Sequence, residues 1–133
     1  QVPFNILGRV GREEPDLSKF SKEAVSEYVR CFADPAAIHA SCEDYRAAGT
    51  IDLEHDRADR AAGLKLKMPM MALWGAEGVV GNMFDCLADW RAVAEQVTGR
   101  AMPCGHFIPE EAPEETLAEV SAFLKLHPIQ SAA

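Results

Sequence analysis

The sequence has few basic residues and lacks the segments that mark several large classes of protein. Lysine and arginine number 13 against 21 aspartate and glutamate residues, so the formal net charge is -8 at pH 7. A surface with this excess of negative charge repels a phosphate backbone, which argues against nucleic acid as a partner. No apolar run approaches the roughly 20 residues that span a bilayer, and the first residues lack the basic and apolar segments of a signal peptide. We therefore expect a cytoplasmic protein that binds neither nucleic acid nor membrane.

Motifs for several kinds of chemistry are also missing. None of the four cysteines belongs to a Cys-x-x-Cys pair, which excludes zinc ribbons and thioredoxin-type redox motifs. There is no phosphate loop, no Gly-x-Gly-x-x-Gly fingerprint and no Gly-x-Ser-x-Gly elbow. An even number of cysteines allows two disulfides, but the missing export signal favours reduced thiols.

The overall composition is that of an ordinary globular domain. The chain has 133 residues and a mass of 14.5 kDa, enough for one domain and not comfortably for two. Hydrophobic residues make up 48% and charged residues 26%, which excludes wholesale disorder. Residues 1–20 are expected to be irregular, with apolar side chains that pack against something. Because the chain begins with Gln1 and not with Met, we expect a processed chain or a piece of something longer.

Three helices are predicted in the first half of the chain. The first, about Ser21 to Phe32, begins at an N-cap serine and carries apolar residues at helical spacing. The second starts at Asp34-Pro35, where an N-cap precedes a proline at the first helical position. The third covers about residues 51–62 and stops at Gly63. Its faces are heavily charged and its apolar stripe is thin, so this helix is marginal by itself.

The second half changes to a pattern of strands, loops and helices. The apolar run of residues 68–74 does not alternate, which suits a parallel strand buried on both faces. A glycine-rich loop follows at residues 75–81, and its glycines indicate a need for backbone freedom. Downstream we expect a helix, a short strand, a turn and a final helix at about residues 84–97, 100–103, 104–107 and 113–126. These are two β-α units of a parallel sheet. Since two parallel strands do not make a stable sheet, part of it is missing or a partner chain supplies it.

His106 is the leading candidate for chemistry. It lies between Gly105 and Phe107, just after the second predicted strand. Ligand-binding and catalytic groups of open α/β sheets gather at the carboxyl ends of the strands, so this position favours a general base. The alternative is a loop histidine that caps the following helix.

Other polar residues have structural interpretations that are simpler than functional ones. Tyr45 lies on the apolar stripe of the second helix, where a core tyrosine is the simpler interpretation and a phenol directed into a pocket is the functional one. Four residues of the third helix have a spacing that can bind metal, but neighbouring arginines indicate a solvated face with ion pairs, so no metal site is expected; they are Asp52, His55, Asp56 and Asp59. Four glutamates near the start of the last helix complement its dipole; they are Glu110, Glu111, Glu114 and Glu115.

Several segments together resemble one family of enzymes. The strand ending in Leu73-Trp74-Gly75, and the loop Pro103-Cys104-Gly105-His106-Phe107 between strand and helix, resemble the C-terminal end of an α/β-hydrolase. Such enzymes place their catalytic histidine in a Gly-His loop after the last strand. The cap-helix segments of residues 38–48 and 51–56, with Gly78-Val79-Val80-Gly81, are similar to the haloacetate (fluoroacetate) dehalogenases. The resemblance covers about residues 5–127.

The resemblance implies a fold class and a division of the chain. The fold would be α/β, the C-terminal portion of an α/β-hydrolase. Residues 1–62 would belong to a helical cap over the active site. Residues 63–133 would supply the last two parallel strands of the main domain and their helices.

A two-step hydrolysis is the chemistry that the resemblance implies. In the family an aspartate displaces the halide from the α-carbon of a small haloacid, and a histidine activates the water that hydrolyses the resulting ester. His106 matches the water-activating base, and Tyr45 matches the cap tyrosine that donates a hydrogen bond to the departing halide. Val79 falls where the family has an apolar pocket wall. No cofactor is implied.

The sequence departs from the wider superfamily in two respects. Gly78 stands where many α/β-hydrolases carry the triad acid, and this gap agrees with the haloacetate branch, which draws its acid from an earlier strand. The nucleophilic aspartate, the substrate-binding arginines and the halide site lie upstream in the family, and none is in this chain. The missing N-terminal half is therefore an expected partner, and we expect the isolated 133 residues to release no halide from fluoroacetate.

Two other functions stay open. An epoxide hydrolase, also a capped α/β-hydrolase, would use Tyr45 as an acid on the epoxide oxygen, but it would more often keep the acid that Gly78 replaces. A non-catalytic, truncated interaction protein would pair with another chain through its strand edge, and a homodimer is one such pairing. Oligomeric state tests this last possibility, because a lone, well-folded monomer is hard to reconcile with partnership.

Overall fold

The structure is a computed structural model, and it describes residues 17–128. The expectation of an irregular, packed segment at residues 1–20 falls almost wholly outside the described residues. The chain divides into two compact units, residues 1–58 and 59–133, and each is described by itself. The division of the chain at residues 62 and 63 into cap and main domain stays a prediction.

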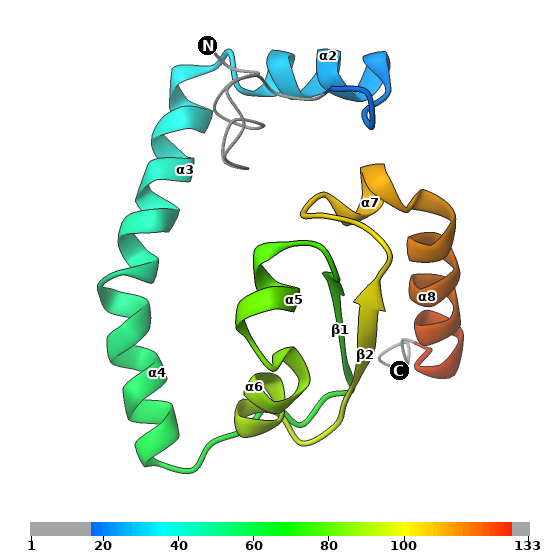
Figure 1. The fold of residues 1–133 in the computed structure, drawn as a ribbon. Coiled ribbons are helices and arrows are strands. Elements are labelled where there is room, and N and C mark those ends of the chain that lie inside the picture. Colours follow the sequence, from blue (N-terminus) through cyan, green and yellow to red (C-terminus); the bar gives the residue numbers. More distant parts are fainter. Residues whose placement is uncertain (1–16, 129–133) are drawn as a thin grey trace. The chain divides into compact units, whose positions relative to one another are not determined.

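The first unit is helical, and its helices begin where the sequence predicts. Helix α2 spans Lys22–Cys31 and helix α3 spans Pro35–Ala48, shown in blue and cyan in Figure 1. The Ser21 hydroxyl accepts a hydrogen bond from the Ala24 N–H at 3.0 Å. The Asp34 carboxylate accepts one from the Ala36 N–H at 2.9 Å. Each cap satisfies one of the amides that a helix start leaves without a partner.

Helix α4, Ile51–Ala61, crosses the boundary between the two units. It ends two residues before Gly63, close to the predicted stop. None of its residues is buried, and none of the described residues of the first unit is buried either. Local hydrogen bonds therefore dominate this part of the chain.

A two-stranded parallel sheet organises the second unit. Strand β1, Met70–Gly75, pairs with strand β2, Val97–Met102, from Met70 opposite Val97 to Gly75 opposite Met102. The pairing continues upstream as an isolated bridge, in which the Leu66 N–H donates to the Val93 carbonyl at 2.9 Å. Because the strands are parallel, both carboxyl ends lie at the same edge of the sheet.

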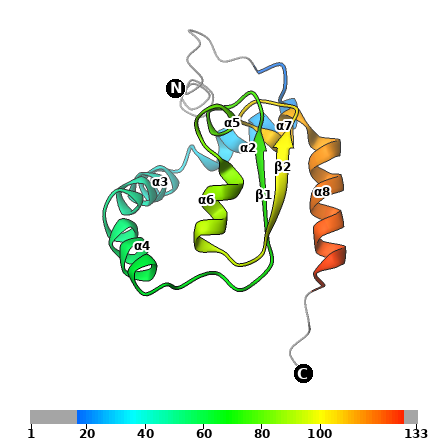
Figure 2. The same cartoon turned by 60° about the horizontal axis from the view of Figure 1, so that its bottom comes forward.

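Helices lie on both sides of these strands (Figures 1 and 2). Helix α5, Val79–Met83, and helix α6, Cys86–Val93, connect β1 to β2 on one side. Helix α8, Pro113–Leu126, lies on the other side, preceded by the single turn of α7, Ile108–Glu111. The Arg100 guanidinium of β2 pairs with the Glu119 carboxylate of α8 at 2.6 Å, which ties that helix to the strand.

A small apolar core lies where β2 and α7 meet. Met102, Cys104 and Ala112 are buried together, with Leu73 and Ile108 packed against them. All buried residues of the described chain lie between Ala72 and Ala112. No helix within residues 17–128 combines the length and apolar character needed to cross a membrane.

The helix predicted over about residues 84–97 is present but shorter: α6 spans Cys86–Val93, and the backbone is extended at Ala94, with φ -136° and ψ 148°. The backbone is extended at Phe84, with φ -131° and ψ 146°, and α6 starts afresh after it. The Asp85 carboxylate accepts a hydrogen bond from the Ala88 N–H at 3.0 Å, so this aspartate is the N-cap of α6, close to the predicted start. Helical periodicity did not show that the helix ends at Val93.

The second strand also begins earlier than the predicted residues 100–103. Val97 and Thr98 belong to β2, because β1 offers six residues for pairing and the ladder takes them all. Both are β-branched, which favours a strand over the end of a helix. The loop of residues 75–81 is likewise shorter than predicted, since α5 starts at Val79.

Candidate active site

Two loops meet at the carboxyl ends of the two strands. The Ala76 N–H, just after β1, donates to the Met102 carbonyl at 2.9 Å. The Glu77 N–H donates to the Cys104 carbonyl at 3.0 Å. The loop after β1 is therefore bonded to the loop that carries His106, and the two are fixed relative to one another.

Gly75 allows the two loops to come this close. A Cβ atom at residue 75 would lie 1.6 Å from the Gly105 carbonyl oxygen and 2.7 Å from the Cys104 carbonyl oxygen. Both neighbours are backbone atoms, which cannot rotate away as a side chain could. Only glycine fits here, so Gly75 and Gly105 form a direct backbone contact beneath the loops.

His106 lies in the loop after β2, as predicted, and its side chain is exposed. Its imidazole packs edge-on against the ring of Phe107, with centroids 5.1 Å apart and an interplanar angle of 78°. Within residues 59–128 no hydrogen bond or ion pair holds the imidazole itself. Its position therefore depends on the backbone of the loop.

Glu111, the last residue of α7, holds that backbone. Its carboxylate accepts a hydrogen bond from the Gly105 N–H at 2.9 Å and another from the Phe107 N–H at 3.0 Å. These two amides flank His106 on either side. The sequence predicts for Glu111 only a role in the dipole of the last helix, and the structure adds this contact. Its position six residues after Gly105 gave no signal for it.

Val79 is the first residue of α5 and follows the loop after β1. A Cβ atom at the preceding Gly78 would lie 3.5 Å from the Gly105 backbone, so the start of α5 lies close to the loop that carries His106. The Val79 side chain is 63% exposed. The fold thus brings two of the three predicted site residues, Val79 and His106, to the same edge of the sheet.

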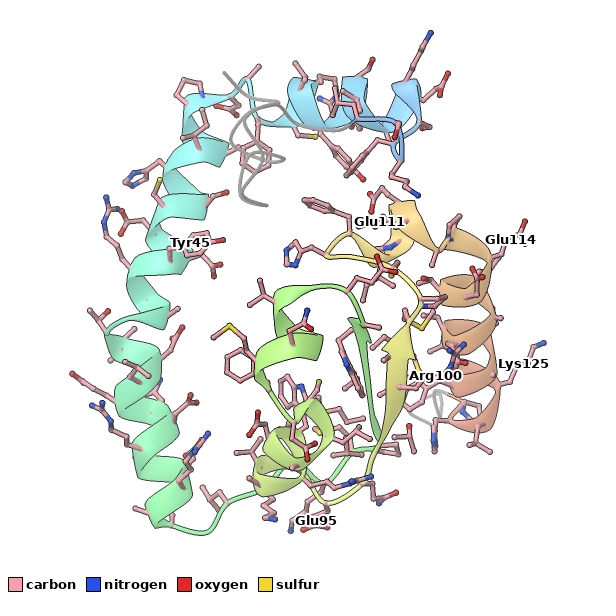
Figure 3. All side chains as sticks on the ribbon, in the orientation of Figure 1. Tyr45, Glu95, Arg100, Glu111, Glu114 and Lys125 are labelled. Carbon is pink, nitrogen blue, oxygen red and sulfur yellow. The ribbon has the colours of Figure 1, made fainter. Side chains whose placement is uncertain are left out.

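Tyr45 belongs to α3 in the first unit, and its role stays a prediction (Figure 3). Its side chain is 63% exposed, so the simpler interpretation as a core tyrosine is wrong for the described chain. The apolar stripe expected on this helix is not buried in the described chain, since none of the helix residues is buried.

The thiol nearest the candidate site is inert in character. All four cysteines are free, with Cys31 and Cys42 exposed and Cys86 and Cys104 buried. Burial raises the pKa of the Cys104 thiol, and the carboxylates of Glu111 and Glu77 raise it further. Burial likewise raises the pKa of the Cys86 thiol. Both therefore stay protonated at neutral pH and are poor nucleophiles.

The acidic residues of α4 remain an exposed helix face. Among the described residues, no group of three or more histidine, cysteine, aspartate or glutamate side chains could hold a metal ion.

Known proteins are similar to this chain over most of its length. The chain is 35% identical over 105 residues to a fluoroacetate dehalogenase of a Burkholderia species, which covers 79% of this chain and 34% of that protein. It is 40% identical over 97 residues to a soluble epoxide hydrolase of Corynebacterium sp. strain C12, which covers 71% of this chain and 31% of that protein. A solved structure from Nostoc sp. PCC 7120, assigned to the α/β-hydrolases, superposes with a TM-score of 0.79 at 51% identity and covers 90% of this chain and 40% of its own.

These similarities confirm the resemblance seen in the sequence. The similarities cover only part of each relative, since this chain spans about a third of the length of the curated proteins it matches. No protein-family model matches the sequence.

Proposed function

We propose that this chain, which has the fold of the C-terminal portion of an α/β-hydrolase, supplies the water-activating half of a haloacetate dehalogenase. The observation that carries the proposal is the loop of His106. It follows the second of two parallel strands and is tied by backbone hydrogen bonds to the loop after the first. Similarity to a fluoroacetate dehalogenase over 79% of the chain supports the choice of reaction.

The proposed reaction has two steps, and this chain acts in the second. First, an aspartate carboxylate outside the chain attacks the α-carbon of the haloacid; a C–O bond forms, the carbon–halogen bond breaks and halide leaves with the electron pair. His106 then takes a proton from water, and the hydroxide attacks the carbonyl carbon of the aspartyl ester. Cleavage of the ester C–O bond releases a 2-hydroxy acid and restores the carboxylate, and His106 returns its proton to solvent.

Tyr45 and Val79 act on the substrate in this proposal. The Tyr45 hydroxyl donates a hydrogen bond to the departing halide, whose charge develops in the transition state. Val79 forms part of the apolar wall that keeps water from the α-carbon. Both side chains are 63% exposed, so each can contact a bound substrate.

The decisive experiment replaces His106 by alanine in the protein as its source makes it. We expect His106→Ala to lower steady-state fluoride release from fluoroacetate by about 10²- to 10⁴-fold, the usual contribution of a general base. The ester should still form, so intact-mass measurement should detect a covalent adduct that persists. His55→Ala, which removes an exposed imidazole from α4, is the matched control and should turn over normally.

The same assays on the isolated chain test the claim that it lacks the nucleophile. The isolated 133 residues should release no fluoride and form no adduct. Turnover by the pure chain would contradict the claim that it lacks the nucleophile, whereas an adduct on the His106→Ala protein that hydrolyses at the normal rate would remove His106 from the proposed role.

The soluble epoxide hydrolase similarity favours a second candidate reaction. Its sequence identity, 40% over 97 residues, is higher than that to the fluoroacetate dehalogenase, although it covers less of the chain. In that reaction His106 keeps its role, and Tyr45 protonates the epoxide oxygen as the ring opens. Assay of the same protein with fluoroacetate and with a terminal epoxide separates the two, because only one substrate should yield turnover that depends on His106.

A third candidate is a partner-binding protein without activity. Large apolar side chains of α8 are exposed, including Leu117 at 68% and Leu126 at 73%, which would suit burial against another chain. Sedimentation of the protein as its source makes it tests this candidate. A homodimer or a stable hetero-complex without halide release would favour it over the dehalogenase.

A further inference from the structure

The carboxylate of Glu111 contacts the loop of His106 at two points. One oxygen, Oε2, accepts from the Gly105 N–H at 2.9 Å, and the other, Oε1, accepts from the Phe107 N–H at 3.0 Å. Both oxygens are therefore used, one for each residue next to His106. Figure 3 shows Glu111 at the end of α7, beside this loop. Hydrogen bonds that end on an ionised carboxylate are stronger than those between neutral groups.

Glycine at residue 105 leaves the space that this contact needs. A Cβ atom there would lie 2.9 Å from Oε1 and 3.0 Å from Oε2 of Glu111. The same residue meets Gly75 on its carbonyl side. The backbone just before His106 is thus held between a strand end and a carboxylate.

Glu111 is itself held in place. The neighbouring Ala112 is buried in the core with Met102, and Ile108 of the same turn packs against that cluster. The Thr116 hydroxyl of α8 lies 3.3 Å from the Ile108 carbonyl of α7 and donates to it, which connects the two helices. The carboxylate therefore transmits the position of the core to the loop.

We infer that Glu111 is a positioning residue for His106, an inference that rests on the proposed function. Within residues 59–128 the imidazole has no hydrogen-bond partner, and its ring contact is with Phe107, whose own N–H Glu111 holds. Its orientation toward water and ester therefore depends on the two amides that Glu111 holds. A role in the dipole of α8 does not require these bonds, and Glu114 and Glu115 already lie in the first turn of that helix.

Glu111→Gln tests the inference with little change in volume. The amide oxygen can accept one of the two N–H groups, but the NH₂ group meets the other as a second donor. Glu111→Asp keeps two acceptor oxygens on a shorter stem and should have an intermediate effect. Glu114→Gln is the matched control, because it removes the same charge from an exposed residue three positions away (Figure 3).

Two measurements are made on the protein as its source makes it. The first is amide hydrogen exchange at Gly105 and Phe107, which needs no activity. We expect exchange at least tenfold faster in Glu111→Gln and unchanged in Glu114→Gln. The second is fluoride release in a single turnover compared with the steady state. Glu111→Gln should release the first equivalent of fluoride at the normal rate, accumulate the ester and then turn over at least tenfold more slowly.

The outcomes distinguish the inference from the function on which it rests. Unchanged exchange in Glu111→Gln would overturn the inference, as would equal slowing of ester formation and ester hydrolysis. Faster exchange, selective accumulation of ester and partial recovery in Glu111→Asp would support it. If the unaltered protein releases no fluoride, the proposed function fails, and the exchange rates then decide on the backbone contact alone.

Discussion

The helical unit and the sheet unit of this chain are stabilised in different ways. In the helical unit the ion pairs of Glu27 with Arg30 and of Glu43 with Arg46 each join residues three positions apart. No described residue of that unit is buried. In the sheet unit the contacts join distant parts of the chain, and the core and the His106 loop depend on them.

The two units should respond differently to the loss of a single contact. A cap or an ion pair within one helical turn contributes only a small part of the free energy of unfolding. Its loss should leave the neighbouring turns intact, because their hydrogen bonds form without it. A loop held by backbone contacts between two strands has no such independence. Substitutions of the same kind should therefore have different effects in the two units.

The largest difference is expected for glycine. Gly75→Ala places a Cβ atom 1.6 Å from the Gly105 carbonyl oxygen, and we expect a loss of about 3 kcal/mol or more in the free energy of unfolding. Gly49→Ala, at the end of α3, meets its nearest neighbours at 3.7 and 3.8 Å and has a φ of -89°. It should be neutral or stabilise by about 0.5 kcal/mol. Urea denaturation measures both, and similar losses for the two variants would contradict the comparison.

Tyr45→Phe asks whether the helical unit contributes to chemistry. Loss of a hydrogen bond to a developing halide charge should cost about 1.5–3 kcal/mol, or about ten- to a hundredfold in kcat/KM for fluoroacetate. The loss should be smaller for chloroacetate, since chloride needs less help to leave. Tyr28→Phe, in α2, is the control and should not change either rate. Equal losses on both substrates would leave Tyr45 without the proposed role.

Asp34→Ala measures the contribution of a local cap. The Asp34 carboxylate accepts from the Ala36 N–H, and its removal should cost about 1 kcal/mol of stability and shorten α3 at its start. Helical ellipticity during thermal unfolding is the measurement. Asp44→Ala, in the exposed middle of the same helix, should have a smaller effect. A larger loss of stability in Asp44→Ala than in Asp34→Ala would contradict the importance of the Asp34 cap for α3.

The smallest effect is expected from pH and concerns α2. The hydrogen bond from Arg30, supported by one from the Cys31 thiol, lowers the pKa of Glu27 from 4.5 to about 2. Because the folded pKa is the lower one, the stabilisation is complete above pH 4.5 and is lost as the pH falls toward 2. The pair is exposed, so salt should screen it. An NMR titration of Glu27 should move its midpoint back toward 4.5 in Arg30→Gln; an unmoved midpoint would contradict this cause.

Local signals predicted the ends of several elements correctly. Ser21 and Asp34 cap helices, the apolar run up to Gly75 is a parallel strand, and Pro113 begins the last helix. Each depends on a few neighbouring residues whose chemistry acts within one turn or one strand. The resemblance to α/β-hydrolases, carried by the Gly-His loop and the cap segments, added the larger architecture.

The errors arose where distant residues decide the structure. The early end of α6 at Val93 goes with the bridge of Ala94 to Leu66, and the early start of β2 at Val97 follows from pairing with β1; no local pattern contains either contact. Glu111 was assigned to a helix dipole because its amide partners became visible only in three dimensions. The candidate base could be found from its position after a strand, but the group that holds its loop could not.

The parallel register of β1 and β2 has a consequence for synthesis of the chain on the ribosome. Met70 pairs with Val97, so β1 has no partner in this sheet until all of α5 and α6 has emerged. Contacts between such distant residues form slowly, whereas α2 and α3 can form as soon as they leave the exit tunnel. Until β2 emerges, the edge of β1 that pairs with it has no hydrogen-bond partners from that strand. This strand is therefore where a chaperone would do most for the yield of folded protein.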